Sequence, residues 1–422
     1  MVIGERIRTA REARVPRWSQ QRLADELSIA RFGEAGFLDR QQVYRWEKGG
    51  RCPTVWAPYI DQVLFTEPHN DPGPTDTDTV ASVMALGRED VERRAFLAAS
   101  VAASLAALNV PDAEAVTRRV GMRTSVRVGM GEVGALRHMI KTLGDAASEL
   151  GGGHARHLTV RYLTEDVKRW LDGTYTEKTG RDLFAATAEL VHLAAWMAKD
   201  EGNEGLAQRY YTHSFHLAAE AGMNETAATA LRGLADQAID LGYLAPALRL
   251  AEGCVEWGKK LDNPKAVAYY SNTLARACAY DLDNTTAQKM LTASESAIEH
   301  AEAAPGESWA SHYSPGRWAH ESAKIYSRLG DQAAAEEHLN LALNIHGLDR
   351  RRTRAMVLAD LSIVQLRREN VDGAVASAEE FASAAEGVRS TRVTNAAHDL
   401  RARIGRKLPD APVLESLEQV GS

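Results

Sequence analysis

Residues with clear potential for chemistry gather near the start of this 422-residue chain. The stretch 40–45, RQQVYR, places Arg40, Gln41, Gln42 and Arg45 close together, and Gln20 precedes them. The forked donors and acceptors of Arg and Gln match the edges of guanine and adenine in a DNA major groove. A polar side chain at the start of a helix, where we expect Gln20, suits a phosphate. The pattern predicts DNA contacts.

Other reactive side chains lack the partners that catalysis or metal binding needs. The histidines of the pairs 154/157 and 213/216 are three residues apart, and no third ligand lies near either pair. We interpret both pairs as exposed polar faces rather than zinc sites. The glycine-rich segment 128–134 lacks a preceding strand, and no P-loop or Ser-His-Asp pattern is present. We expect no enzyme, no metal and no cofactor.

Helical spacing predicts the elements that position the DNA-contacting residues. Leu23, Ala24, Val43 and Trp46 have the spacing of a buried helical face. Pro16 and the pair Gly49-Gly50 mark helix ends. The predicted helices cover 3–14, 19 to about 27, 39–48, a segment opened by Pro53, and 58–64.

The ordered set of residues in these helices resembles the lambda-repressor-like (xenobiotic-response-element, XRE) helix-turn-helix family. The matching residues are Gly4, Ile7, Arg8, Arg11, Ser19, Gln20, Leu23, Ala24, Val43, Arg45, Trp46, Glu47, Gly49 and Pro53. The resemblance implies base or phosphate contacts by Gln20, Arg40, Gln41, Gln42 and Arg45. It also implies that Glu47 braces the helices. The connection 28–38 departs from the family, since its 11 residues replace a turn of about 3–4. A solvated face used for protein contact is the alternative.

Composition and charge favour an all-α protein with a basic head. The chain has 13 Pro and a net charge of −7, yet residues 1–64 hold eleven Arg and Lys against eight Asp and Glu. A basic end on an acidic body fits contact with phosphates. The three widely spaced cysteines indicate a reducing compartment. The uncharged run 95–110 is shorter than the ~20 residues of a membrane span. We expect a cytoplasmic protein without a membrane partner.

The segment 66–80, TEPHNDPGPTDTDTV, has the composition of a linker. It combines three Pro with four acids and contains no Lys or Arg. The sequence therefore predicts five parts in order: a helix-turn-helix domain 1–65, a linker 66–80, connecting helices 81–130, a repeat domain 131–408 for sensing and dimerisation, and a tail 409–422.

A repeat of helix, turn and helix occupies the body. In each unit an alanine follows the turn by five residues, at 207, 247, 287, 335 and 374. The spacings of 40, 40, 48 and 39 are too regular for chance. Stacking the units buries apolar surface that a single helix pair could not bury alone. The repeat resembles tetratricopeptide repeats, whose usual period is about 34. The sequence thus predicts an α-solenoid behind the head.

In tetratricopeptide proteins the first helix of each unit lines a concave groove, and that register implies a ligand site here. Its members are His192, Trp196, Arg232, Asp236, Tyr269, Asn272, Arg276, His320 and Lys324. The fifth unit turns apolar, which suits packing against the last helix or a second copy. Solvated helix faces are the plainer alternative.

Head and repeats together resemble the RRNPP peptide-sensing (quorum-sensing) transcriptional regulators. The resemblance implies a homodimer on an inverted-repeat operator of double-stranded DNA, controlled by a signalling peptide or small molecule. A protein-interaction scaffold that senses no ligand is the second hypothesis.

Overall fold

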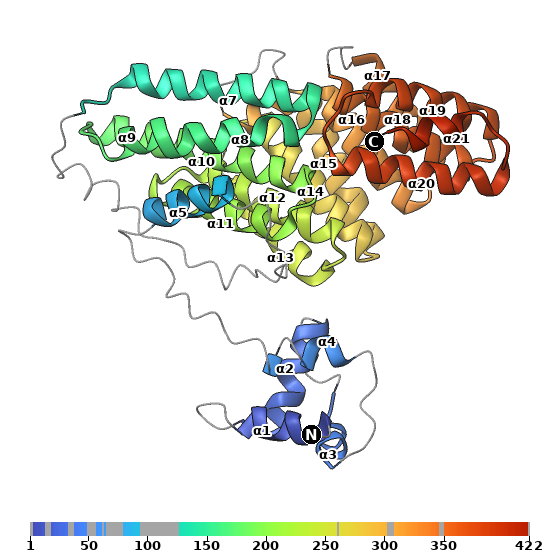
Figure 1. The fold of residues 1–422 in the computed structure, drawn as a ribbon, viewed down its shortest axis with the longest axis horizontal. Helices are drawn as coiled ribbons and strands as arrows, with labels where there is room; N and C mark the ends of the chain where they lie inside the picture. The colour runs from blue at the N-terminus through green and yellow to red at the C-terminus, as the bar shows by residue number, and fades with distance from the viewer. Residues whose placement is uncertain are drawn as a thin grey trace. The chain divides into compact units, whose positions relative to one another are not determined.

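The computed structural model describes ten stretches of the chain. They are 3–12, 18–32, 38–48, 56–60, 63–64, 79–92, 126–259, 261–301, 308–345 and 350–420. Most of the predicted linker, the Ala-rich run 95–110 and residues 53–55 of the segment opened by Pro53 lie outside them. Within them the structure is helical, and an isolated bridge between Arg127 and Thr174 is the extended pairing present (Figure 1).

The chain divides into two compact units, Met1–Pro74 and Thr75–Ser422. The first contains α1 (Ile3–Glu12), α2 (Gln20–Phe32), α3 (Arg40–Glu47) and α4 (Ala57–Ile60). Their shared core includes Ile7, Leu23, Val43 and Trp46. Gly4 is required in α1, because a Cβ there would lie 2.0 Å from the carbonyl oxygen of Trp46. This close approach fixes α1 against α3.

The second helix is longer than the sequence predicts. It continues to Phe32 rather than ending near Leu27, so almost half of the 28–38 connection is helical. Ser28 explains the extension, since its hydroxyl donates to the carbonyl of Ala24 at 2.8 Å and accepts from the backbone N–H of Leu38 at 3.0 Å. The insertion is thereby tied to α3. Its residues 33–37 lie outside the described part.

Paired helices build the second unit. Each pair has an inner helix, named first below, and an outer helix, named second. The pairs are α10 (Glu177–Asp200) with α11 (Glu204–Glu220), α12 (Asn224–Asp240) with α13 (Leu244–Gly258), α14 (Pro264–Tyr280) with α15 (Asn284–Glu299), α16 (Pro315–Leu329) with α17 (Gln332–Ile345), and α18 (Arg351–Arg367) with α19 (Val371–Ala385). Before them come α5 (Thr79–Glu92), α7 (Met130–Leu150), α8 (Gly152–Tyr162), a π-helical turn (Leu163–Val167) and α9 (Lys168–Leu171), and after them α20 (Thr391–Lys407) and α21 (Val413–Glu418). Successive pairs pack on one another in a solenoid-like stack (Figure 1).

The repeated alanines occupy one structural position. Each is the fourth residue of an outer helix and is fully buried. Five residues before each, the turn has a positive φ, with Gly in three units and Leu282 or Glu369 in the others. Only a small side chain fits where two helices approach this closely, and glycine adopts positive φ at least cost. The short-range pattern therefore encodes the helix pairs.

The stack curves until its two ends meet. The backbone N–H of Arg389 donates to Leu150 at 2.7 Å, and that of Gly153 donates back to Arg389 at 3.2 Å. Arg351 forms an ion pair with Glu149 at 2.6 Å. A Cβ on Gly151 would lie 2.2 Å from the carbonyl oxygen of Arg389, so glycine permits the contact. The helices α7 and α8, which precede the first pair, therefore contact α18 and the α19–α20 connection, and these contacts close a ring.

The fifth pair packs against the helix that follows it. Ala359 and Leu366 of α18 share a core with Val393, Ala397 and Leu400 of α20. The apolar inner face of the fifth unit is thus buried within the chain. Among the described residues, none of the helices has the length and apolar character of a membrane span.

Candidate functional site

The third helix of the first unit presents a polar face. Val43 and Trp46 are buried in the core, whereas Arg40, Gln41 and Arg45 are exposed. Asp39 caps α3, and Gln42 completes the capping box by accepting from the backbone N–H of Asp39 at 3.1 Å. The helix start is therefore rigid, and one acceptor of Gln42 is already used.

Gln20 is turned toward an internal brace rather than outward. Its side-chain nitrogen donates to Glu47 at 2.6 Å, and Arg11 contacts the other oxygen of Glu47 at 2.6 Å. Arg11 also donates to the carbonyl of Trp18 at 2.7 Å. The hydrogen bond that Arg11 donates to Glu47 raises the pKa of Arg11, although burial opposes it. This brace links α1, α2 and α3 and fixes the angle of α3.

The inner helices of the second unit surround a cavity of about 640 Å³. Seven of the nine predicted ligand residues line it: Trp196, Arg232, Asp236, Asn272, Arg276, His320 and Lys324. The other two lie behind its wall. His192 is buried between Tyr211 and Trp309, with ring centroids 5.0 and 4.8 Å away. Tyr269 is buried beneath Arg232, whose guanidinium lies 4.4 Å from its ring.

Two aspartates near the end of α12 anchor one half of a buried charge cluster. Lys199, 2% exposed, contacts Asp236 at 2.6 Å and Asp240 at 2.9 Å. Arg276 bridges the same two carboxylates, and Arg392 reaches Asp240 at 3.1 Å. Burial would raise the pKa values of both aspartates, but these cations hold them well below the ordinary range. Both carboxylates are therefore ionised.

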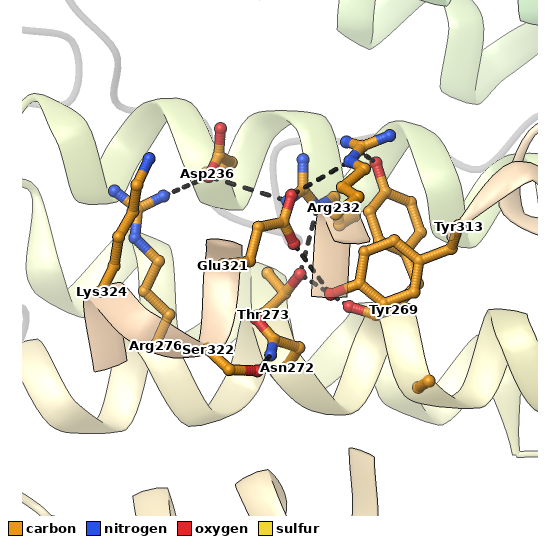
Figure 2. A network of polar contacts seen from close by, with 12 residues as sticks. Arg232, Asp236, Tyr269, Asn272, Thr273, Arg276, Tyr313, Glu321, Ser322 and Lys324 are labelled. Carbon is orange, nitrogen blue, oxygen red and sulfur yellow. Dashed lines mark hydrogen bonds and ion pairs between the residues drawn. The ribbon is translucent and has the colours of Figure 1, made fainter. Parts of the chain in front are cut away.

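Glu321 anchors the other half. It accepts from Arg232 at 2.8 Å, from Arg317 at 3.2 Å and from the Tyr313 hydroxyl at 3.1 Å. Arg232 also lies 3.9 Å from Asp236, and Figure 2 shows Glu321 beside Arg232, with Asp236 on one side of them and Tyr269 and Tyr313 on the other. Burial raises the pKa of Tyr313 far above its usual value, so its hydroxyl remains a donor. Arg232 thus joins α12 to α16 across the cavity.

We call the whole cluster the ion network and define it by its ion pairs. Its cations are Lys199, Arg232, Arg276, Arg317, Lys324, Arg352 and Arg392, and its carboxylates are Asp200, Asp236, Asp240, Glu321 and Asp360. Seven positive groups therefore face five negative ones. Such an arrangement can hold an anion; nothing in it resembles a nucleophile paired with a base.

Known proteins offer no guide here. The chain matches no protein-family model, and no curated protein is significantly similar to it. Its function is therefore inferred from its own residues.

The sequence suggested that the histidine pair 213/216 lies on an exposed face, and this prediction is wrong. His216 is 6% exposed, and burial lowers the pKa values of both rings to about 4. Apolar helix packing around them explains the error. Burial and the nearby arginines also lower the pKa of His192 to about 3. Within the described residues no three ligands converge on a metal position.

Among the cavity residues that sequence reasoning missed are Arg352, Arg392 and Trp309. Arg352 donates to Asp200 at 3.0 Å, and its guanidinium lies 5.0 Å from the ring of Trp196. The sequence did contain one indication of the missed arginines. Asp200 and Asp240 are the last residues of their helices, where the helix dipole disfavours a carboxylate. Two such aspartates, one repeat apart, indicate compensating cations from elsewhere in the chain.

Proposed function

We propose that this protein is a sequence-specific, DNA-binding transcriptional regulator whose repeat body binds a ligand in the cavity. The observation that carries the DNA part is the division of α3. One face, Val43 and Trp46, is fixed in the core, while Arg40, Gln41 and Arg45 project from the other. Arg and Gln side chains on the outward face of a helix that the core holds in place are the donors and acceptors that read base edges.

The brace at Glu47 supports the same proposal. Base reading requires side chains to be held in register with the groove. The contacts of Glu47 with Arg11 and Gln20 fix α3 relative to two other helices. The resemblance to helix-turn-helix regulators adds the expectation of a homodimer on an inverted repeat, with half-sites about one helical turn apart.

Selection of bound fragments from random double-stranded DNA by the full chain tests this proposal. We expect a defined motif, and Gln41→Ala or Arg45→Ala should weaken binding to it by about 1–3 kcal/mol and relax the preference at one position. Arg401→Ala, at an exposed arginine of α20, is the matched control and should change nothing. Selection without a motif would favour an interaction scaffold instead.

A further inference from the structure

The charge of the cavity lining is opposite to that of the whole chain. Ten Arg and Lys line the cavity against four Asp and Glu, in a protein whose net charge is −7. Many of these cations have partners, yet the ion network still has two more positive than negative groups. Lys265 and Glu189, also in the lining, leave that difference unchanged. His320 adds no charge, because burial lowers its pKa.

Excess charge of one sign is costly at this depth. The side chains of Arg232, Arg276 and Arg352 are only 8–12% exposed. A buried cation without full compensation costs several kcal/mol in folded proteins, whereas a buried anion nearby offsets that cost. The walls hold these cations in fixed positions through their ion pairs. An entering anion therefore meets a preorganised site.

Two hydrogen-bond donors in the lining indicate the same kind of ligand. The indole Nε1 of Trp309 and the Nε of Arg276 are buried and make no hydrogen bond within the described residues. Both atoms only donate. A ligand that completes their hydrogen bonds must bring acceptor oxygens, which is what a carboxylate or phosphate supplies.

The size and remaining surface of the cavity define the rest of the ligand. Trp196, Leu193, Ile140 and Met356 supply apolar and aromatic lining. A volume of about 640 Å³ lies within the ~300–1,000 Å³ of sites for small organic molecules. Because the ring is closed, the cavity is not an extended, open-ended groove.

We propose that the cavity binds a compact organic anion, with two negative charges from carboxylate or phosphate groups on an aromatic or aliphatic body. This inference rests on the proposed function, since it names the class of ligand that the regulator senses. The anion lies against the ion network, and its apolar body lies against Trp196. Arg352 and Arg392 belong both to this network and to the ring closure, so the bound anion stabilises the closed ring.

Calorimetric titration of the full chain with probes that share one ring system tests the proposal. Naphthalene-1,5-dicarboxylate and 1-naphthyl phosphate carry the charge, and 1-naphthalenemethanol is the neutral match. We expect both dianions to bind about tenfold or more tightly than the alcohol, with a difference that shrinks at high ionic strength. A preference between the dianions identifies phosphate or carboxylate as the natural group.

Three variants separate charge from shape. Lys324→Met should weaken both dianions about tenfold without affecting the alcohol, and Glu321→Gln, which removes one negative charge, should tighten them several-fold. Arg161→Met, at an exposed arginine of α8, is the control and should leave all three affinities unchanged. Thermal unfolding checks that each variant folds. If Lys324→Met does not fold, Glu321→Gln and the probe series still decide.

Equal affinity for the alcohol and the dianions, or no binding by any probe, overturns the proposal. These titrations contain no DNA, whereas the selection of DNA fragments contains no ligand. Failure of the anion site and failure of the DNA-binding function are therefore distinguishable. If an extended peptide binds and the dianions do not, the proposal of a ligand-sensing regulator stands and the proposal of a compact anion as its ligand is wrong.

Discussion

The third helix and the wall of the cavity use the same side chains in opposite ways. Arg40 and Arg45 of α3 are exposed, and their positions follow from one eight-residue helix. Arg232 and Arg276 are buried among carboxylates from other repeats. An exposed cation adds little to stability and is available to a partner, whereas a buried one depends on every charge around it. Function on the surface is therefore separable from folding, and function in the cavity is not.

The largest expected effect is at the centre of the ion network. Asp236→Ala removes a carboxylate from Lys199, Arg232 and Arg276 and leaves buried cations uncompensated. We expect the free energy of unfolding of the second unit to fall by about 3–5 kcal/mol. Urea unfolding followed by circular dichroism measures it. Glu165→Ala, which breaks an exposed pair with Arg161, should cost less than about 0.5 kcal/mol. Similar losses of stability in Asp236→Ala and Glu165→Ala would contradict the difference between buried and exposed ion pairs.

The second effect concerns pH. Burial lowers the pKa values of His192, His213 and His216 to about 3–4, so the folded state keeps these rings neutral while the unfolded state protonates them below about pH 6.5. Stability is therefore complete above pH 6.5 and falls as the pH drops, by about 1.4 kcal/mol per pH unit for each ring. The depressed aspartates add their own loss only below about pH 4.

The single histidine of the first unit is His69, in the predicted linker, and residues 1–65 contain none, so the stability of the first unit should stay nearly constant from pH 7.5 to 5.5. Hydrogen exchange read separately for each unit checks this difference. His216→Leu should reduce the pH slope of the second unit by one ring, since neither nitrogen of His216 has a hydrogen-bond partner. His154→Leu, at an exposed histidine, should leave the slope unchanged. An unaltered slope in both variants contradicts the assignment.

The smallest expected effect concerns the contacts of Glu47 with Arg11 and Gln20 in the first unit. Glu47→Ala removes the acceptor of Arg11 and Gln20, and we expect it to destabilise the first unit by about 1–3 kcal/mol. Arg45→Ala should change its stability by less than about 0.5 kcal/mol while weakening DNA binding. Hydrogen exchange in α1 and α3 measures both. A destabilising Arg45→Ala would mean that the exposed face also supports the fold.

Features set by near neighbours in the sequence could be predicted. The alanines at 207, 247, 287, 335 and 374 gave the helix pairs because each reports a local close approach. The register implied by the resemblance to tetratricopeptide repeats placed seven of nine ligand residues on the cavity. His192 and Tyr269 fell behind the wall, since a helical register does not say how deep a bulky ring lies. The end of α2 was missed because Ser28 is satisfied by Leu38, beyond the helix.

Features set by distant partners could not be predicted. Arg352 and Asp200 are 152 residues apart, and Arg351 and Glu149 are 202 apart. Neither pair leaves a periodic trace in the sequence. The curvature that brings them together accumulates from small rotations between helix pairs. Arg392 and Arg352 therefore could not be identified as cavity residues from the sequence, because only the closed ring brings them to the cavity.

Ring closure also has a consequence for how the body gains and loses its structure. Open repeat arrays fold and fray unit by unit, because each unit touches only its neighbours. Here Leu150 of α7 and Gly153 of α8 are hydrogen-bonded to Arg389, so these two helices lose partners whenever the end of the stack opens. Opening should therefore be concerted, and the final contacts can form only after the ribosome has released Arg389. Contacts of such long sequence separation also slow folding, which makes this body a late-maturing part of the chain.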